Sequence, residues 1–301
     1  MDTDPIIASI RSAVRAIGPH FNPEVLRQTR DIYRPHSAAT DASITVQRDI
    51  EYGPHARHRL DLYRSGSGRR PVLVFVHGGG FVGGSKDEDG TFHRNVGEYF
   101  ARHGFLAIVP NYRLAPADPW PAGAQDVDRV LQWVRDQSDA INAIPGAIHL
   151  IGQSAGASHV ASWLFDPTLQ ATQRPTVVAV VLMAGFYKAQ APLVPPIRSY
   201  FGADESKYVE RSPISHVVGQ HPRLLLTVGV VRPNRTRRVD ADTVEAAGRE
   251  SVLGQRQHRE RLRVLRRELT VVHVQNDQVG AVLRVERRSE EHTSELQSPY
   301  V

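Results

Sequence analysis

The chain contains no cysteine among its 301 residues, which excludes a disulfide framework and a thiolate metal site. It also lacks an apolar run approaching the roughly 20 residues that a membrane-spanning helix needs. The first residues, MDTDPIIASIRSAVRAIG, begin with acidic side chains and lack the apolar segment of a secretory signal. These absences predict a protein with no membrane span, and we expect it in the cytoplasm.

Aromatic side chains are scarce in the C-terminal part. Tyr300 is the only aromatic residue at 230–301, whereas 14 of the 34 arginines lie there. Residues 1–229 carry 23 basic and 21 acidic side chains, so this part is nearly neutral although the whole chain has a formal charge of +5. A basic surface that would bind nucleic acid is therefore not expected on the aromatic-rich part.

The hydrophobic pattern alternates between strands and helices. Residues 5–34 predict one or two amphipathic helices, which form either a packed cap or a surface arm. The later strands are expected at 43–52, 58–64, 71–77, 105–112, 147–153, 176–185 and 223–229, and the helices near 90–103, 121–137 and 157–165. This alternation predicts an α/β fold with a mostly parallel, doubly wound sheet in one core, at 43–229, behind N-terminal cap helices at 1–42.

Residues 152–156 form a G-x-S-x-G sequence with Ser154 at its centre. The motif ends one predicted buried strand and opens a helix, which is the setting that a nucleophile elbow requires. The sharp turn exposes the serine hydroxyl, and the helix N-terminus behind it offers N–H groups to an oxyanion. A serine that only caps an ordinary helix is the alternative interpretation.

His77 and the three glycines that follow it also come directly after a predicted buried strand. Without side chains, the N–H groups of such a loop can approach a ligand closely. Together with the N–H after a nucleophilic serine, they can bind the oxyanion of a tetrahedral intermediate. Gly79, Gly80 and Ala155 are therefore the predicted oxyanion-hole donors. A flexible glycine loop without function is the alternative.

Three segments together resemble the α/β-hydrolase superfamily: HGGGFVGGSK at 77–86, PNYRLAP with WPAGAQDV at 110–127, and GQSAGASHVA at 152–161. Over about residues 50–229 the chain is similar to hormone-sensitive-lipase-like carboxylesterases and to kynurenine-formamidase-like enzymes. The lipase-like branch usually has Asp before the serine and a second Gly after the motif. Gln153 and Ala157 stand there in this chain, which favours the formamidase-like neighbours.

The resemblance implies an α/β-hydrolase fold and a serine hydrolase of carboxylic esters, with an arylformamidase-type amide hydrolase as the alternative. It implies a small-molecule ester or amide substrate and no cofactor, and the scattered histidines predict no metal site. His77, Phe81 and Trp120 are expected near the substrate. Asp126 is expected to brace its loop rather than to catalyse. A protein that keeps the pocket and binds ligands without catalysis, as the plant gibberellin receptors of this superfamily do, is a further alternative.

The resemblance also implies an acid and a histidine, in that order, after the serine. Near the expected positions the chain has Arg232 and, at 266–268, Arg-Arg-Glu. The nominal candidates are Asp240 for the acid and His273 for the base, and His273 could instead be a core histidine in a strand. Since loss of a triad member costs several orders of magnitude in rate, we expect the polypeptide to be inactive or nearly so.

The last residues have an unusual composition. RSEEHTSELQS, which opens the adapter-like tail assigned to 288–301, resembles a translated sequencing-library adapter. We interpret 230–287 as a doubtful region, translated at least in part from a shifted reading frame, because a GC-rich gene read out of frame tends to give arginine. Residues 270–286 resemble the family's final turn and helix. The C-terminal part is therefore expected to be incomplete or disordered, and a divergent authentic C-terminus is the alternative.

Overall fold

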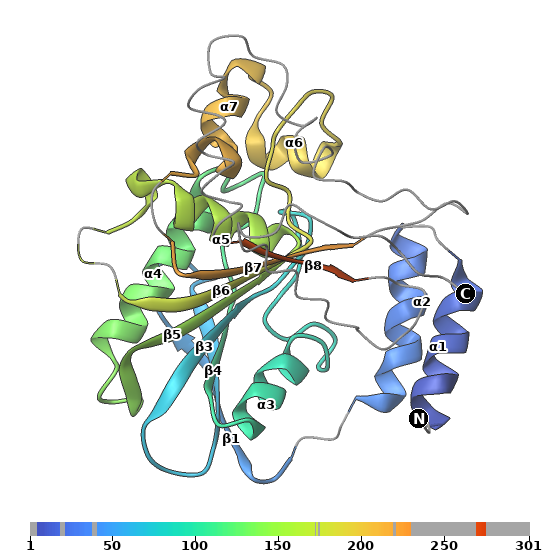
Figure 1. The fold of residues 1–301 in the computed structure, drawn as a ribbon, viewed down its shortest axis with the longest axis vertical. Helices are drawn as coiled ribbons and strands as arrows, with labels where there is room; N and C mark the ends of the chain where they lie inside the picture. The colour runs from blue at the N-terminus through green and yellow to red at the C-terminus, as the bar shows by residue number, and fades with distance from the viewer. Residues whose placement is uncertain are drawn as a thin grey trace, which may run out of the picture.

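The computed structural model describes residues 5–18, 22–37, 41–171, 173, 175–218, 221–229 and 269–274. Its centre is a sheet with the strand order β1-β2-β4-β3-β5-β6-β7-β8 (Figure 1). β2 pairs antiparallel with β1 and with β4, and all the other pairs are parallel. Of these strands, β2 alone therefore runs against the common direction.

The first seven strands fall where the apolar runs predict them, and an eighth, β8, was not predicted. Their bounds are β1 Ile44–Glu51, β2 Arg59–Ser65, β3 Arg70–Val76, β4 Leu106–Pro110, β5 Ala143–Gln153, β6 Val177–Met183, β7 Arg223–Gly229 and β8 Leu269–Val274. β3 and β4 are buried over most or all of their length, because helices cover both faces at the centre of the sheet. Strands of this kind read as continuous Val, Ile and Leu.

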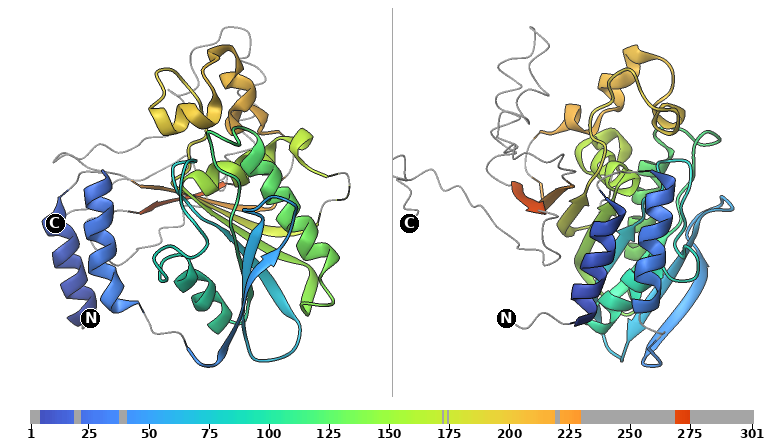
Figure 2. Two further views of the ribbon diagram at one scale, coloured as in Figure 1. Left: turned by 180° about the vertical axis from the view of Figure 1, so that it is seen from behind. Right: turned by 90° about the vertical axis from the view of Figure 1, so that its right-hand side faces the viewer.

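Helices cover the two faces of the sheet, as predicted for a doubly wound fold (Figures 1 and 2). α3 (Arg94–Arg102) packs on β2 and β4, over a cluster that contains Tyr63, Phe75 and Val109. α4 (Ala122–Asp136) and α5 (Ala155–Phe165) pack together on the other face, over the larger cluster. Gly97 allows α3 to approach closely, because a Cβ there would lie 2.5 Å from the Tyr63 ring.

The N-terminal segment forms two helices, α1 (Pro5–Ile17) and α2 (Pro23–Tyr33), which lie side by side at one flank (Figures 1 and 2). Asn22 caps α2 by accepting a hydrogen bond from Val25 N at 2.9 Å. Ile10 alone is buried among the residues of these two helices. The short 3₁₀ helix η1 (Arg34–His36) follows.

The connection between β6 and β7 was not predicted to have helices, yet it forms several short ones above the sheet (Figure 1). They are α6 (Pro195–Phe201), η3 (Glu205–Lys207), α7 (Tyr208–Arg211) and η4 (Pro213–His216), and η2 (Pro167–Leu169) precedes β6. Each is too short to show a helical period in the sequence, so only the packing reveals them.

The predicted final turn and helix at 270–286 is wrong for its first residues. Leu269–Val274 forms a strand that pairs parallel with β7. The rest of that prediction lies outside the described residues, as do the adapter-like tail and most of the doubtful region. Among the described helices, none is both long enough and apolar enough to cross a membrane.

Candidate active site

Ser154 lies in a strained turn between β5 and α5. Its φ of +53° and ψ of −120° are unusual for a residue with a side chain, and such strain persists only where the surroundings hold it. The Ser154 N–H donates to Met183 O at 2.7 Å, which fixes the turn to the neighbouring strand. The predicted elbow geometry is therefore present at Ser154.

The glycines on both sides of Ser154 are required by backbone contacts. A Cβ on Gly152 would lie 2.6 Å from Ala157 Cα, and one on Gly156 would lie 2.2 Å from Val76 O. Both distances are shorter than real Cβ contacts, so a side chain at either position would push α5 away from β3 and β5.

The glycine loop after β3 lies against the elbow. A Cβ on Gly78 would lie 3.1 Å from Ser154 Cβ, so the loop and the serine are direct neighbours. Gly79 has a φ of +147°, and a side chain there would meet Gly83 O at 1.9 Å. Gly79 and Gly80 are exposed. Within the described part of the chain, the N–H groups of Gly79, Gly80 and Ala155 have no acceptor.

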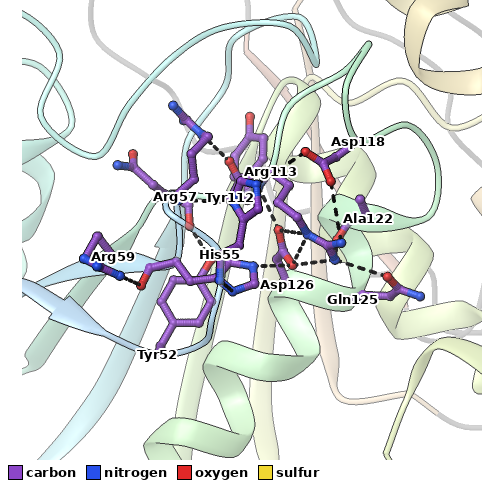
Figure 3. Close-up of polar contacts among 12 residues, drawn as sticks. Tyr52, His55, Arg57, Arg59, Tyr112, Arg113, Asp118, Ala122, Gln125 and Asp126 are labelled. Atoms are coloured by element: carbon purple, nitrogen blue, oxygen red, sulfur yellow. Dashed lines mark hydrogen bonds and ion pairs between the residues drawn. The ribbon is translucent and has the colours of Figure 1, made fainter.

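Arg57 and Tyr112, which lie side by side in Figure 3, hold the two ends of the glycine loop. Arg57 donates from Nε to Tyr112 O at 2.7 Å and from Nη2 to Gly84 O at 2.9 Å. The Tyr112 hydroxyl donates to His77 O at 3.0 Å. The loop is thus fixed where it leaves β3 and where it turns back, while its glycine tip stays accessible.

Asp126 lies next to Arg113 (Figure 3), and its hydrogen bonds go to Arg113 and His58. Its buried carboxylate accepts from Arg113 N at 2.7 Å and from Arg113 Nε at 2.9 Å. It also lies 3.0 Å from His58 Nε2, and burial lowers the pKa of His58 despite this carboxylate. The prediction that Asp126 braces its loop is confirmed.

The three residues expected near the substrate take different positions. His77 is fully buried and stacks on Tyr112 with ring centroids 4.4 Å apart. A side chain without exposed surface cannot touch a substrate in this conformation, so the prediction of substrate contact by the His77 side chain is not supported. Phe81 is also buried, whereas Trp120 is half-buried.

Phe81 and Trp120 belong to a separate apolar cluster next to the elbow. The cluster also contains Ala155 and residues of the β6–β7 connection, among them Tyr200, Phe201 and Tyr208. The sequence analysis missed the residues from this connection. The signal that could have found them is the concentration of aromatic residues at 186–208, in a stretch without strand or long-helix periodicity.

Among the residues whose side chains the structure describes, which end at 227, no histidine nitrogen lies within hydrogen-bond distance of the Ser154 hydroxyl. Asp240, the nominal acid, lies outside the described residues. The described residues contain no group of three or more His, Asp or Glu side chains that could hold a metal ion.

The backbone position of His273 separates it from Ser154. The strand register runs from Gln153 through Met183 and Thr227 to Val272, so His273 stands at the level of Ser154 but on β8. Three strand spacings of ~4.8 Å separate β5 from β8, which makes about 14 Å. The described backbone thus places His273 three strands away from Ser154, and its role as the base stays a prediction.

Comparison with known proteins gives one family and a common fold. Residues 60–172 match the BD-FAE family. The chain is 28% identical over 256 residues to the esterase LipQ of Mycobacterium tuberculosis, which covers 73% of this chain and 59% of LipQ. It is 41% identical over 108 residues to the phenmedipham hydrolase of Pseudarthrobacter oxydans, covering 33% of this chain and 21% of that protein. The chain thus spans less than two thirds of these relatives.

Solved structures of esterases share the fold. An esterase from the bacterial hormone-sensitive lipase family superimposes with a TM-score of 0.61 at 20% identity, over 92% of this chain and 90% of that one. Esterase B from Lactobacillus rhamnosis gives a TM-score of 0.61 at 17% identity, over 88% and 84%. The predicted α/β-hydrolase fold is confirmed.

Proposed function

We propose that this chain, which belongs to the α/β-hydrolase superfamily, has the active-site design of a serine hydrolase that cleaves carboxylic esters through an acyl-enzyme on Ser154. One observation carries the proposal: a strained, partly exposed serine lies directly against a glycine loop whose N–H groups have no acceptor among the described residues. The esterases among the relatives support an ester substrate.

The chemistry follows from this geometry. The Ser154 hydroxyl attacks the ester carbonyl, and the N–H groups of Gly79, Gly80 and Ala155 donate to the oxyanion that forms. Donors that are aligned before the reaction need no reorganisation as the charge develops, so each contributes about 3 kcal/mol to the transition state. The alcohol leaves, and water then releases the acid from the acyl-enzyme.

Slow turnover is expected of this polypeptide. The serine proton needs an imidazole acceptor, and no histidine whose side chain the structure describes reaches Ser154. An oxyanion hole without a complete triad retains roughly 10³–10⁴-fold acceleration over water. The same observation favours a second candidate function, that of a protein that binds small esters or amides without turning them over.

Two measurements separate these functions. Hydrolysis of p-nitrophenyl acetate that is abolished in Ser154→Ala supports the hydrolase. A fluorophosphonate probe that labels Ser154 within minutes supports an activated serine, whereas a binding protein stays unlabelled. Unchanged hydrolysis in Ser154→Ala would refute the role of this serine. Comparing the ester with an N-formyl anilide tests the arylformamidase-type alternative.

A further inference from the structure

His159 is a polar ring at a fully buried position. It stands on α5, beyond the first turn after Ser154, and is 1% exposed. Gly123 of α4 makes room for it, since a Cβ there would lie 2.3 Å from the ring. An apolar side chain would fill the space without the cost of burying two nitrogen atoms. The position of its hydrogen bond explains why a histidine stands here.

The bond connects the nucleophile helix to the segment above the sheet. His159 Nδ1 and the Tyr200 hydroxyl of α6 lie 3.1 Å apart. Among the described residues, this is the only side-chain hydrogen bond between α5 and α6. Nε2 of the same ring has no partner among them, so the histidine is held by this one bond.

The ring of His159 also touches the supports of the glycine loop. Its centroid lies 5.4 Å from that of Phe81, which follows the glycines, and 4.6 Å from that of Tyr112. Both contacts are edge-to-face, which is a favourable arrangement for aromatic pairs. Through these contacts, His159 connects the helix α5, to which it belongs, with the loop that carries the oxyanion donors.

Tyr200 places α6 directly over that loop. Its ring stacks on Phe81 with centroids 4.5 Å apart and planes at 9°, and its carbonyl accepts from Trp120 N at 2.9 Å. Pro196, at the start of α6, is 4.0 Å from the Cβ position of the exposed Gly80. An acyl chain attached to a carbonyl at Gly80 must therefore pass close to α6.

We propose that the His159–Tyr200 hydrogen bond is a latch that holds α6 over the oxyanion loop and limits the length of the acyl group that the site accepts. His159 is a positioning residue and Tyr200 a specificity-determining one. While the bond is intact, the gap between α6 and Gly80 has a fixed size. Without it, α6 keeps the Tyr200–Phe81 stack, the Trp120 N–H bond to Tyr200 O and the contacts of Phe201 with Arg211 and Phe186, but it loses its hydrogen bond to α5 and can move outward. The inference rests on the proposed function, because it describes the acyl side of the same site.

Tyr200→Phe tests the latch, with Tyr208→Phe as a matched control. Tyr208 lies in the same segment and is also buried, but its hydroxyl donates to Gly202 O at 3.0 Å, within that segment. Hydrogen exchange of the amides of residues 197–201 is expected to become faster in Tyr200→Phe and to stay unchanged in Tyr208→Phe. Unchanged exchange in Tyr200→Phe would overturn the latch.

Acyl selectivity is the functional measurement. We expect the ratio of kcat/KM for p-nitrophenyl octanoate to that for the acetate to rise about fivefold in Tyr200→Phe, the effect of one hydrogen bond. His159→Phe should give the same rise, and the double variant no further rise, because both remove one bond. A purely structural bond would lower stability and leave this ratio unchanged, which would overturn the assignment of specificity.

Acyl selectivity can also be measured by binding. The ratio of the dissociation constants for the octanoate and the acetate is determined in the Ser154→Ala background, where the ester is not consumed. If the wild-type protein turns over no ester, the proposed function fails, while the ratio of dissociation constants with and without Tyr200→Phe still decides the latch. An equal change in Tyr208→Phe would also contradict it.

Discussion

At several positions of this site, the residue type is determined by the space available and by the polar groups nearby. Gly156 of α5 is the clearest case, because backbone atoms at the end of β3 occupy the place of its side chain: Val76 O lies at 2.2 Å and His77 O at 2.4 Å from a Cβ built there. Neither atom can move without displacing β3. The glycine of the motif is thus set by tertiary packing as much as by the turn.

Gly156→Ala is expected to lower the free energy of unfolding by about 2–3 kcal/mol, because α5 must shift away from β3. Urea denaturation measures this change. Gly83→Ala is the control, since a Cβ there meets only Gly79 O at 3.6 Å, an ordinary contact. Equal stability losses in the two variants would contradict the packing argument.

Asp126→Asn removes the buried charge that faces Arg113. We expect a loss of about 3 kcal/mol in stability, because the substitution leaves the guanidinium and a backbone N–H with a weaker acceptor at a 1% exposed position. Asp118→Asn is the matched control, since Asp118 is more exposed and lies 3.9 Å from the same arginine. There the loss should stay below about 0.5 kcal/mol. The comparison is made by thermal and urea unfolding.

Two buried histidines make stability depend on pH. Burial lowers the pKa of both His77 and His159 to about 3, from an ordinary value of 6.5. His93 and Arg57 lower the pKa of His77 further, whereas Asp126 acts in the opposite direction on His159. Between these pKa values the unfolded chain binds more protons than the folded one, so stability is complete above pH 6.5 and falls as the pH drops toward 3.

Replacing His159 by Phe should therefore flatten the decline of the urea midpoint between pH 7 and about pH 4. The acidic residues contribute to the decline in both proteins and cancel in the comparison. An unchanged slope would contradict this prediction, because it would mean that His159 has the same protonation state in the folded and the unfolded protein.

At the scale of the secondary-structure elements, α2 has no buried residue and contacts the rest of the chain through charged side chains. Arg30 pairs with Glu88 at 2.9 Å, Arg34 pairs with Asp89 at 3.3 Å, and both guanidinium groups lie 5.8 Å from the Phe92 ring. These partners belong to the loop between β3 and α3. Surface contacts of this kind contribute about 1 kcal/mol or less each, and salt weakens them.

The double substitution Arg30→Ala and Arg34→Ala should release the N-terminal helices before the core unfolds. Limited proteolysis within residues 5–37 is expected to become faster, while the main thermal transition shifts little. Arg27→Ala is the control, because Arg27 pairs with Glu24 and Asp31 inside α2. A similar increase in cleavage for Arg27→Ala would contradict this anchoring.

For the molecule as a whole, the elbow, the glycine loop and the segment above them come from residues 41–218, and none of these residues supplies a base for Ser154. If the base is all that is missing, free imidazole should supply it. We expect imidazole to raise the rate of p-nitrophenyl acetate hydrolysis in proportion to its neutral fraction, beyond its own reaction with the ester. Ser154→Ala protein should show no such gain. The absence of a Ser154-dependent gain would mean that more than the base is lacking.

The sequence by itself determined the strands β1 to β7 and the turn that carries Ser154. Buried parallel strands need continuous apolar runs, and an elbow needs small residues around its serine, so both leave local signals at 71–80 and 147–156. Only the tertiary structure decided what surrounds them. His77 is adjacent to the glycines in sequence, but the Tyr112 stack places its ring under the loop, and the β8 register places His273 three strands from Ser154. The His159–Tyr200 contact joins positions 41 residues apart, which no local pattern encodes.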